Sequence, residues 1–397
     1  MLPSIVVAGH ICLDVFPDLS KLPPGSINEC LQPGHLTVVG PVAFSTGGPV
    51  SNTGLVLHKL GIPTRLAAKI GDDPFGQVVR GIVGSFDPKL LGGMVSKPDI
   101  STSYTVVISP PGTDRIFLHC PGANDAFGPE DVSVDLLKET SLFHFGYPPL
   151  MKRMFADGGN ELREVFQIAR EAGTTTSLDM AFPDGASEAG RAEWREILTK
   201  VLPLVDVFMP SIEETLFLLK RDTYKELVSA AGGGNILSKV SPDLLGDVGR
   251  ELLSMGAAVV GLKLGDRGLY VRTSEAGRLA AMGRAGVDAS TWADREVWSP
   301  CFQVKCVGTT GSGDATIAGF LAALVRGSSL LETATAAVAV GACNVEAPDA
   351  LGGIQTWDSI QRRISAGWPR RSDSAPAGWQ TEPGSKVWVN CKGNCAA

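Results

Sequence analysis

The stretch CVGTTGSGDATIAGFLAALVRG, from Cys306 to Gly327, carries most of the information about fold and chemistry in this chain. We expect a strand over Phe302–Val307, then a Gly/Thr/Ser turn, then a helix over Ala315–Arg326 with apolar residues at helical spacing. Closely spaced glycines are justified where another group must approach the backbone. Because the turn ends at a helix N-terminus, its free amides are expected to attract an anion.

Asp314 lies in the first turn of this predicted helix, beside the amides of Gly311, Ser312 and Gly313. In the simplest interpretation its carboxylate only complements the helix dipole. A carboxylate inside an anion site is poorly suited to simple binding but well suited to phosphoryl transfer, where it accepts the proton of the attacking hydroxyl.

The chain has no Gly-Lys pair and is therefore no P-loop enzyme. The turn also lacks the third glycine of a dinucleotide fingerprint, so hydride transfer is a weak alternative.

A second segment, STGGPVSNTGLVLHKLGIP at residues 45–63, is typical of a ligand-binding turn followed by a helix. Gly47 and Gly48 allow a sugar-sized ligand to reach backbone amides, and Asn52 offers a donor and an acceptor to hydroxyl groups. Asp14 follows the first predicted strand, where open α/β sheets bind ligands. A tight turn with ordinary polar neighbours is the structural alternative.

Short β-branched runs alternate with longer segments of helical period, which favours βα units around a parallel sheet. The expected strands are Ser4–Ala8, Thr64–Ile70, Ser141–Phe145, Thr174–Asp179, Val205–Met209 and Ala257–Leu262. The expected helices, besides the one after Asp314, are Pro49–Leu60, Glu161–Ala172, Glu193–Leu202, Ile212–Leu219 and Leu244–Met255. Leu36–Phe44, Tyr104–Ile108 and Ile116–Cys120 have no helices between them, and we expect a small sheet that projects like a lid.

Three stretches interrupt this pattern. Residues 221–243 are interpreted as a surface loop, and residues 274–300 as an insertion in which Trp292 and Trp298 serve packing. Residues 368–397, rich in Pro, Ser and Gly, are expected to form an extended C-terminal tail.

Charge and composition exclude several classes of function. Lys and Arg number 35 against 42 Asp and Glu, a net charge of −7 without a basic run, so binding to nucleic acid is not expected. The N-terminus makes a poor signal peptide and no apolar run is long enough to span a membrane. Eight cysteines are too dilute for a disulfide framework, which favours a cytoplasmic protein with reduced thiols. The five histidines are scattered without metal spacing, and none is nominated as a catalyst.

Taken together, these segments resemble the PfkB/ribokinase family of carbohydrate kinases over roughly residues 4–355. Residues 47–61 resemble the family's N-terminal signature and residues 309–319 its C-terminal signature. Between them, Lys69–Gly76 is similar to the family's G-x-D-x-F-G turn, Ser211–Glu214 to its N-x-x-E motif and Lys263–Gly268 to its T-x-G-x-x-G nucleotide turn.

The resemblance implies a ribokinase-like α/β fold, with a mostly parallel sheet sandwiched by helices and a small β lid. Residues 1–367 would form the kinase domain, with the lid made from segments at about 10–45 and 100–120. Asp314 would be the catalytic base, with the amides of Gly311, Ser312 and Gly313 as the anion hole. The remaining implied residues are Asp14, Gly47, Gly48 and Asn52 for the sugar, Glu214 for Mg²⁺, and Ser211, Lys263, Gly265 and Gly268 for the nucleotide.

The chain departs from the family pattern at several positions. Gly308 stands where the family has an Asp that commonly helps to bind a monovalent cation, which leaves activation by such a cation open. Ser211 replaces the usual Asn and Lys263 the usual Thr, while Asp179-Met-Ala-Phe-Pro differs from the D-x-N-x-R of some sugar-acid kinases.

We therefore predict an ATP-dependent kinase that phosphorylates a hydroxyl of a monosaccharide or related polyol, with Mg²⁺ as cofactor. A homodimer is compatible with this prediction, and no nucleic acid or membrane partner is expected. Two alternatives stay open. A nucleoside kinase of the same fold would need an apolar slot, which Phe44 and Phe117 could supply, and a sugar-sensing protein could have kept the fold without catalysis.

Overall fold

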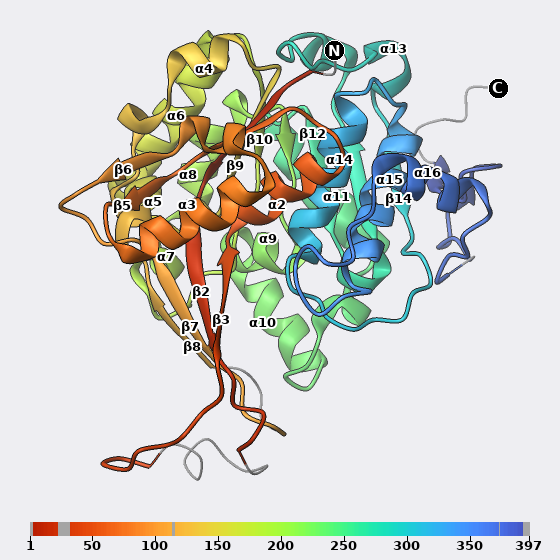
Figure 1. Cartoon of the computed structure of the whole chain (residues 1–397). Coiled ribbons are helices and arrows are strands. Elements are labelled where there is room, and N and C mark those ends of the chain that lie inside the picture. Colours follow the sequence, from red (N-terminus) through yellow and green to blue (C-terminus); the bar gives the residue numbers. More distant parts are fainter. Residues whose placement is uncertain (1–2, 23–31, 113–115, 373, 392–397) are drawn as a thin grey trace.

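Ten strands form one sheet through the centre of the molecule (Figure 1). The structure, a computed structural model, describes residues 3–22, 32–112, 116–372 and 374–391. From edge to edge the strands are β15 (Trp379–Thr381), β16 (Trp388–Asn390), β14 (Glu296–Ser299), β13 (Leu269–Thr273), β12 (Val259–Lys263), β11 (Val207–Phe208), β10 (Thr175–Leu178), β9 (Leu142–Gly146), β1 (Ile5–Gly9) and β4 (Thr64–Ala67). Neighbouring strands from β12 to β4 run parallel, and the others pair antiparallel. The predicted α/β class with a mostly parallel sheet is confirmed.

Helices cover both faces of this sheet because successive side chains of a strand point to opposite sides. In β1, Ile5 and Val7 belong to one buried apolar cluster, and Val6 and Ala8 belong to a second. Helices of the first cluster are α2 (Pro49–Lys59), α3 (Pro74–Phe86), α12 (Ala276–Ala280), α13 (Ala289–Trp292), α14 (Ser312–Leu324), α15 (Leu330–Asn344) and α16 (Trp357–Ser365). Those of the second are α4 (Val134–Lys138), α5 (Lys152–Phe155), α6 (Asn160–Glu171), α8 (Trp194–Val201), α9 (Ile212–Leu219) and α11 (Pro242–Ser254), and α7 (Glu188–Arg191) precedes α8. Every predicted helix is found, and no helix in the described part of the chain could cross a membrane.

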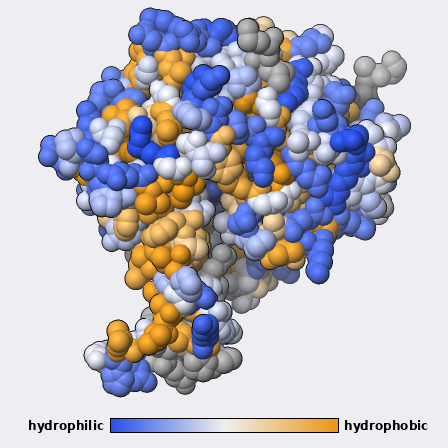
Figure 2. All heavy atoms as spheres, viewed as in Figure 1, coloured by the Kyte–Doolittle hydropathy of each residue, from blue (hydrophilic) through white to orange (hydrophobic). Residues whose placement is uncertain are grey.

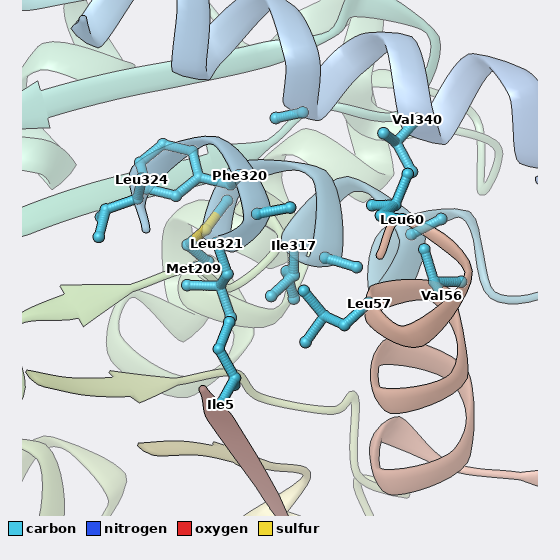
Figure 3. Close-up of a cluster of buried hydrophobic side chains, with 14 of the residues drawn as sticks. Ile5, Val56, Leu57, Leu60, Met209, Ile317, Phe320, Leu321, Leu324 and Val340 are labelled. Atoms are coloured by element: carbon cyan, nitrogen blue, oxygen red, sulfur yellow. The ribbon is translucent and has the colours of Figure 1, made fainter. Parts of the chain in front are cut away.

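The helix that follows the glycine turn, α14, packs against α2 and α15 in the core (Figure 3). Ile317, Phe320 and Leu321 are fully buried there. Gly319 permits the close contact with α15, because a Cβ at this position would lie 2.8 Å from the Cβ of Val340. Full burial of each large apolar side chain contributes roughly 1.5–3 kcal/mol, so the N-terminus of α14 is held firmly at the sheet edge.

A second sheet of four strands projects from the body (Figure 1). In the order β3-β2-β7-β8 it contains β3 (Val42–Gly47), β2 (Cys12–Pro17), β7 (Tyr104–Ile108) and β8 (Ile116–Cys120), while β5 (Lys69–Gly71) and β6 (Val95–Lys97) form a separate pair. Both predicted strands between 104 and 120 are confirmed. The prediction of Leu36–Phe44 is wrong at its start, because the strand begins at Val42 and Leu36 is 93% exposed. Figure 2 shows that the surface of this projection is largely apolar. Residues 23–31 and 113–115 of the predicted lid segments lie outside the described residues.

Two local predictions are wrong. Residues 221–243 are not a loop throughout, since α10 (Arg221–Ala230) lies there with Tyr224, Leu227 and Val228 packed at helical spacing against the core. Residues 303–307 form no strand, and Phe302 makes only a single bridge to Arg370. β16 occupies the place beside β14, so residues 303–307 cannot pair with that strand.

The segment after residue 368 also differs from the expected extended tail, because β15 and β16 complete the main sheet. Trp379 and Trp388 pack edge-on against Trp298, with the ring centroids of Trp298 and Trp388 5.4 Å apart. Trp292 and Trp298 are both buried, which confirms their predicted packing role. The Pro-, Ser- and Gly-rich composition of this segment predicts a tail, and the tryptophans within it are the local signal that it packs against the body. Residues 392–397 lie outside the described part of the chain.

We predict that Trp388→Ala lowers the free energy of unfolding by about 3–5 kcal/mol, because Trp388 is only 5% exposed and its removal leaves a cavity beside Trp298. Trp388→Phe, which keeps an aromatic ring, should lose much less. Urea denaturation followed by circular dichroism measures both. If Trp388→Ala unfolds at the wild-type midpoint, the segment is the dispensable tail that composition alone indicates.

Candidate active site

Side chains from the ends of several parallel strands meet at one edge of the main sheet. His10 follows β1, Tyr147 follows β9, Asp179 follows β10, and Lys263 is the last residue of β12. The strands β1, β9 and β10 pair in register, so their carboxyl ends lie side by side. This is the edge where open α/β sheets bind ligands, and α14 delivers Asp314 to it.

Asp314 is buried in the first turn of α14, with 2% of its surface exposed. Its Oδ2 accepts a hydrogen bond from Asn52 Nδ2 at 2.9 Å, and the Tyr147 hydroxyl lies 3.1 Å from both carboxylate oxygens. Burial raises the pKa of the Asp314 carboxyl, and the bonds from Asn52 and Tyr147 act in the opposite direction. The structure therefore brings the two predicted signatures into contact through a buried carboxylate of the kind that serves as a general base.

Tyr147 was not identified from the sequence. Its backbone is left-handed, with φ of 64°, which is rare for a bulky residue and is often retained at functional sites. Burial, followed by the charge of Asp314, raises the pKa of the Tyr147 hydroxyl, which therefore stays protonated and donates to Asp314. The available signal was a phenol at the end of a predicted strand, directly before Pro148 and Pro149.

A buried ion pair lies beside Asp314. Lys263 Nζ is 2.5 Å from Asp179 Oδ1, and the two side chains are 12% and 1% exposed. Burial lowers the pKa of Lys263, but the charges of Asp179 and Glu214 outweigh this effect and raise it, so the ammonium persists. Burial raises the pKa of Asp179, whose Oδ2 has no hydrogen-bond partner in the described part of the chain. Lys263 was predicted as a site residue, whereas Asp179 was noted only as a departure from another motif.

The glycine turn lies next to this ammonium, since a Cβ on Gly313 would be 3.8 Å from Lys263 Nζ. Gly311, with φ of 71°, begins the helix. The prediction of three free amides is wrong for Ser312, whose N–H donates to Thr309 O at 3.2 Å. Gly311 and Gly313 lie at the helix N-terminus, where amides have no intrahelical acceptor.

Ser211 and Glu214 form a capping box at the start of α9. The Ser211 N–H donates to Glu214 Oε2 at 2.6 Å, and the Glu214 N–H donates to Ser211 Oγ at 3.1 Å. No three Asp, Glu, His or Cys side chains converge as ligands of one metal within the described residues. Mg²⁺ commonly keeps several waters and binds through one or two carboxylates plus substrate phosphates, so Glu214 beside Lys263 and Asp179 fits such an ion.

Gly265 and Gly268 lie in the hairpin between β12 and β13. Both have positive φ, 53° and 98°, and a Cβ at Gly268 would lie 2.0 Å from Ser299 O. These glycines are therefore required by the turn itself, and nothing in their geometry requires a nucleotide.

The predicted sugar residues Asp14, Gly47 and Gly48 are brought together where the projecting sheet meets the body. Cys12 pairs with Gly47 across β2 and β3, and a Cβ at Gly47 would lie 2.3 Å from Asp14 Oδ2. Gly48, with φ of 84°, is in contact with His10. Burial raises the pKa of the Asp14 carboxyl.

Comparison with known proteins gives the chain a consistent set of relatives. A model of the pfkB family of carbohydrate kinases matches residues 3–357. A fructokinase-1 of Zea mays is 25% identical over 293 residues, which cover 72% of this chain and 76% of the maize protein.

Solved structures show the same fold. A ribokinase of Arabidopsis thaliana, in complex with ribose and ATP, superposes with a TM-score of 0.66 at 18% identity, covering 91% of this chain and 98% of the other. An E. coli protein assigned as a ribokinase II, in complex with ATP and Mg²⁺, also superposes with a TM-score of 0.66, at 19% identity and with 92% and 100% coverage. The predicted ribokinase-like fold is confirmed.

We predict that Lys263→Met lowers the free energy of unfolding by about 3–5 kcal/mol near pH 8, because it leaves the buried Asp179 carboxylate unpaired. The loss should shrink as the pH falls, since the raised pKa of Asp179 lets the folded protein take up a proton before the unfolded chain does. Urea denaturation at pH 8 and pH 5.5 measures this. The double variant Lys263→Met/Asp179→Asn is the matched control and should recover most of the loss; equal instability of both variants at both pH values would contradict the buried pair.

Proposed function

The chain belongs to the pfkB family of carbohydrate kinases, and we propose that it uses Asp314 to transfer the γ-phosphoryl group of ATP to a hydroxyl of a monosaccharide or related polyol. The observation that carries this proposal is the buried Asp314 carboxylate, held by Asn52 and Tyr147 at the N-terminus of α14. A carboxylate at an anion-attracting helix end is useful when a proton must be removed beside a phosphoryl group.

In the proposed step, Asp314 accepts the proton of the acceptor hydroxyl as its oxygen attacks the γ-phosphorus and ADP leaves. The donors from Asn52 and Tyr147 fix the carboxylate, so little reorganisation is needed when the hydroxyl arrives. Burial of Asp314 raises its pKa and makes it a stronger base than an exposed Asp, while the bonds from Asn52 and Tyr147 favour its ionised form.

The charge that develops on the phosphoryl group would be stabilised by the amides of Gly311 and Gly313 at the helix N-terminus and by the Lys263 ammonium, which lies beside Gly313. Glu214 would hold Mg²⁺ through water, and the bound ion would supply positive charge that neutralises part of the phosphate charge. The E. coli relative solved with ATP and Mg²⁺ supports these cofactors.

Nucleotide and sugar would approach from different sides. Ser211, Gly265 and Gly268 border the nucleotide side with Lys263, to which Ser211 is joined by a parallel β-bridge. Asp14, Gly47 and Gly48 border the sugar side, and Asn52 connects that side to Asp314. Activation by a monovalent cation stays open; the carbonyls of Ala347 and Pro348 lie close to Gly308.

The alternatives have less support. For a nucleoside kinase, Phe44 and Phe117 would have to line one slot. Phe44 pairs with Val15 and Phe117 pairs with Val107, and this register places the two phenylalanines on opposite faces of the projecting sheet. The two rings cannot form the single slot that a nucleoside base would need. A non-catalytic sensor would have no use for the buried base. A cytoplasmic location and a homodimer stay predictions.

We predict that Asp314→Asn lowers kcat by about 10²–10⁴-fold while sugar and ATP still bind, because the amide keeps the shape but cannot accept the proton. A coupled ADP-release assay over monosaccharides, polyols and nucleosides gives kcat, and calorimetry gives binding. A variant with near-wild-type kcat would remove Asp314 from the role of base.

We also predict that Tyr147→Phe moves the acid limb of the pH profile of kcat/KM to higher pH. Activity requires ionised Asp314 and is lost as the pH falls through its raised pKa. The Tyr147 bond favours the ionised form, so its loss raises that pKa further. Tyr224→Phe, on the surface helix α10, is the control and should leave the profile unchanged. An acid limb at the wild-type position in Tyr147→Phe would contradict the contact with the base.

A further inference from the structure

A row of polar side chains crosses all four strands of the projecting sheet. Ser45 pairs with Asp14 across β3 and β2, Asp14 pairs with Thr105 across β2 and β7, and Thr105 pairs with His119 across β7 and β8. Residues that pair directly in this way lie on one face of a sheet. His119 is therefore on the same face as Asp14, the residue that we propose binds the sugar.

Hydrogen bonds join His119 to Asp14 along this row. His119 Nδ1 lies 3.0 Å from Thr105 Oγ1, and the Thr105 hydroxyl donates to Cys12 Sγ at 3.8 Å. The Cys12 thiol in turn donates to Asp14 Oδ1 at 3.3 Å. The Thr105 hydroxyl has two acceptors on this row, Cys12 Sγ and the Asp14 carboxylate, and we therefore assign the donor role at the His119 contact to Nδ1–H. A neutral imidazole then carries its acceptor lone pair on Nε2.

A second histidine, His10 of the main body, packs against His119. The ring centroids of His10 and His119 are 5.6 Å apart, and the ring of His10 is 6.2 Å from that of Tyr147. His10 is buried and neither of its nitrogens has a hydrogen-bond partner in the described part of the chain. Burial lowers the pKa of His10 to about 3 and also lowers the pKa of His119, so both rings are neutral near pH 7. Together the two rings connect the projecting sheet to the tyrosine that holds Asp314.

The chemistry of this face selects a class of acceptor. The strands CLDVFP, VAFSTG, YTVVI and IFLHC contain no Lys or Arg, so they offer no positive charge to the carboxylate of a sugar acid or the phosphate of a sugar phosphate. They offer instead the Asp14 carboxylate and the acceptor nitrogen of His119, which both receive hydrogen bonds from hydroxyl groups.

We propose that His119 is an acceptor-binding residue that receives a hydrogen bond from one hydroxyl of an uncharged sugar or polyol while Asp14 receives another. This inference rests on the proposed kinase function and adds the substrate class and a binding residue from β8. Thr105 and Cys12 are positioning residues, because they fix the tautomer of His119 and orient Asp14.

The test compares His119→Phe, which keeps a ring against His10 but removes the acceptor nitrogen, with the wild-type enzyme on the best acceptor and its monodeoxy analogues. We expect the variant to have an about tenfold lower kcat/KM because its KM for the acceptor rises, while kcat and the KM for ATP stay unchanged. With the wild type, one deoxy analogue should have an about tenfold lower kcat/KM than the parent acceptor. With the variant, that analogue and the parent acceptor should have equal kcat/KM. His119→Gln, whose carbonyl can accept, should restore part of the discrimination. Leu118→Phe, on the opposite face of β8, is the matched control.

Two results would overturn the proposal. One is a His119→Phe enzyme that keeps wild-type kcat/KM or the full series of deoxy penalties. The other is a wild-type enzyme that prefers a sugar acid or sugar phosphate to every uncharged acceptor. A wild type without turnover on any acceptor would contradict the kinase function, and calorimetry with uncharged sugars and polyols on wild type and His119→Phe would then test His119 separately.

Discussion

Burial of the Asp314 carboxylate is the constraint on which the rest of the site depends. A carboxylate taken out of water is costly unless donors surround it. Here one donor comes from α2, through Asn52, and another from the end of β9, through Tyr147. Three elements that are far apart in the sequence must therefore hold fixed positions. Tyr147 meets this requirement with a left-handed backbone, a conformation that bulky residues rarely adopt.

The hydrophobic core provides this fixed geometry. α14 is anchored by Ile317, Phe320 and Leu321 against α2 and α15, so the helix end that carries Asp314 cannot shift without disturbing the core (Figure 3). The parallel strands bring Tyr147, Asp179 and Lys263 to the same edge. Leu13 of β2 joins the projecting sheet to this core, and the polar row of that sheet meets the body through His10 and His119. In the proposed mechanism, this rigid edge carries out phosphoryl transfer and the projecting sheet contributes to binding of the acceptor.

The sequence predicts the parts of this structure that have a local signal. Both glycine turns, Asp314 and Asn52 are recognisable because their residue types and spacing have a physical purpose, whereas Lys263 was reached through the family resemblance. Periodicity locates α2, α6, α8, α9, α11 and α14 and the strands of the parallel part of the sheet. The roles of Tyr147, Asp179, His10 and His119 depend on strand ends or paired strands that come together in the fold. The local sequence gives at most a weak signal for them, such as the position of Tyr147 before Pro148. The strands at Trp379 and Trp388 were missed because pairing with β14, a long-range interaction, overrides the loop-like composition around them. The hydrogen bond from Ser312 to Thr309 likewise depends on how the turn closes.

The central claim is that Asp314 receives the proton of the acceptor hydroxyl. A crystal structure of the protein with an accepted sugar and a non-hydrolysable ATP analogue tests it most directly. The account predicts that one sugar hydroxyl lies about 2.6–3.2 Å from an Asp314 carboxylate oxygen, with that hydroxyl oxygen in line with the γ-phosphorus. A ternary complex in which the hydroxyl facing the γ-phosphorus contacts another group, and Asp314 bonds protein groups alone, would contradict it.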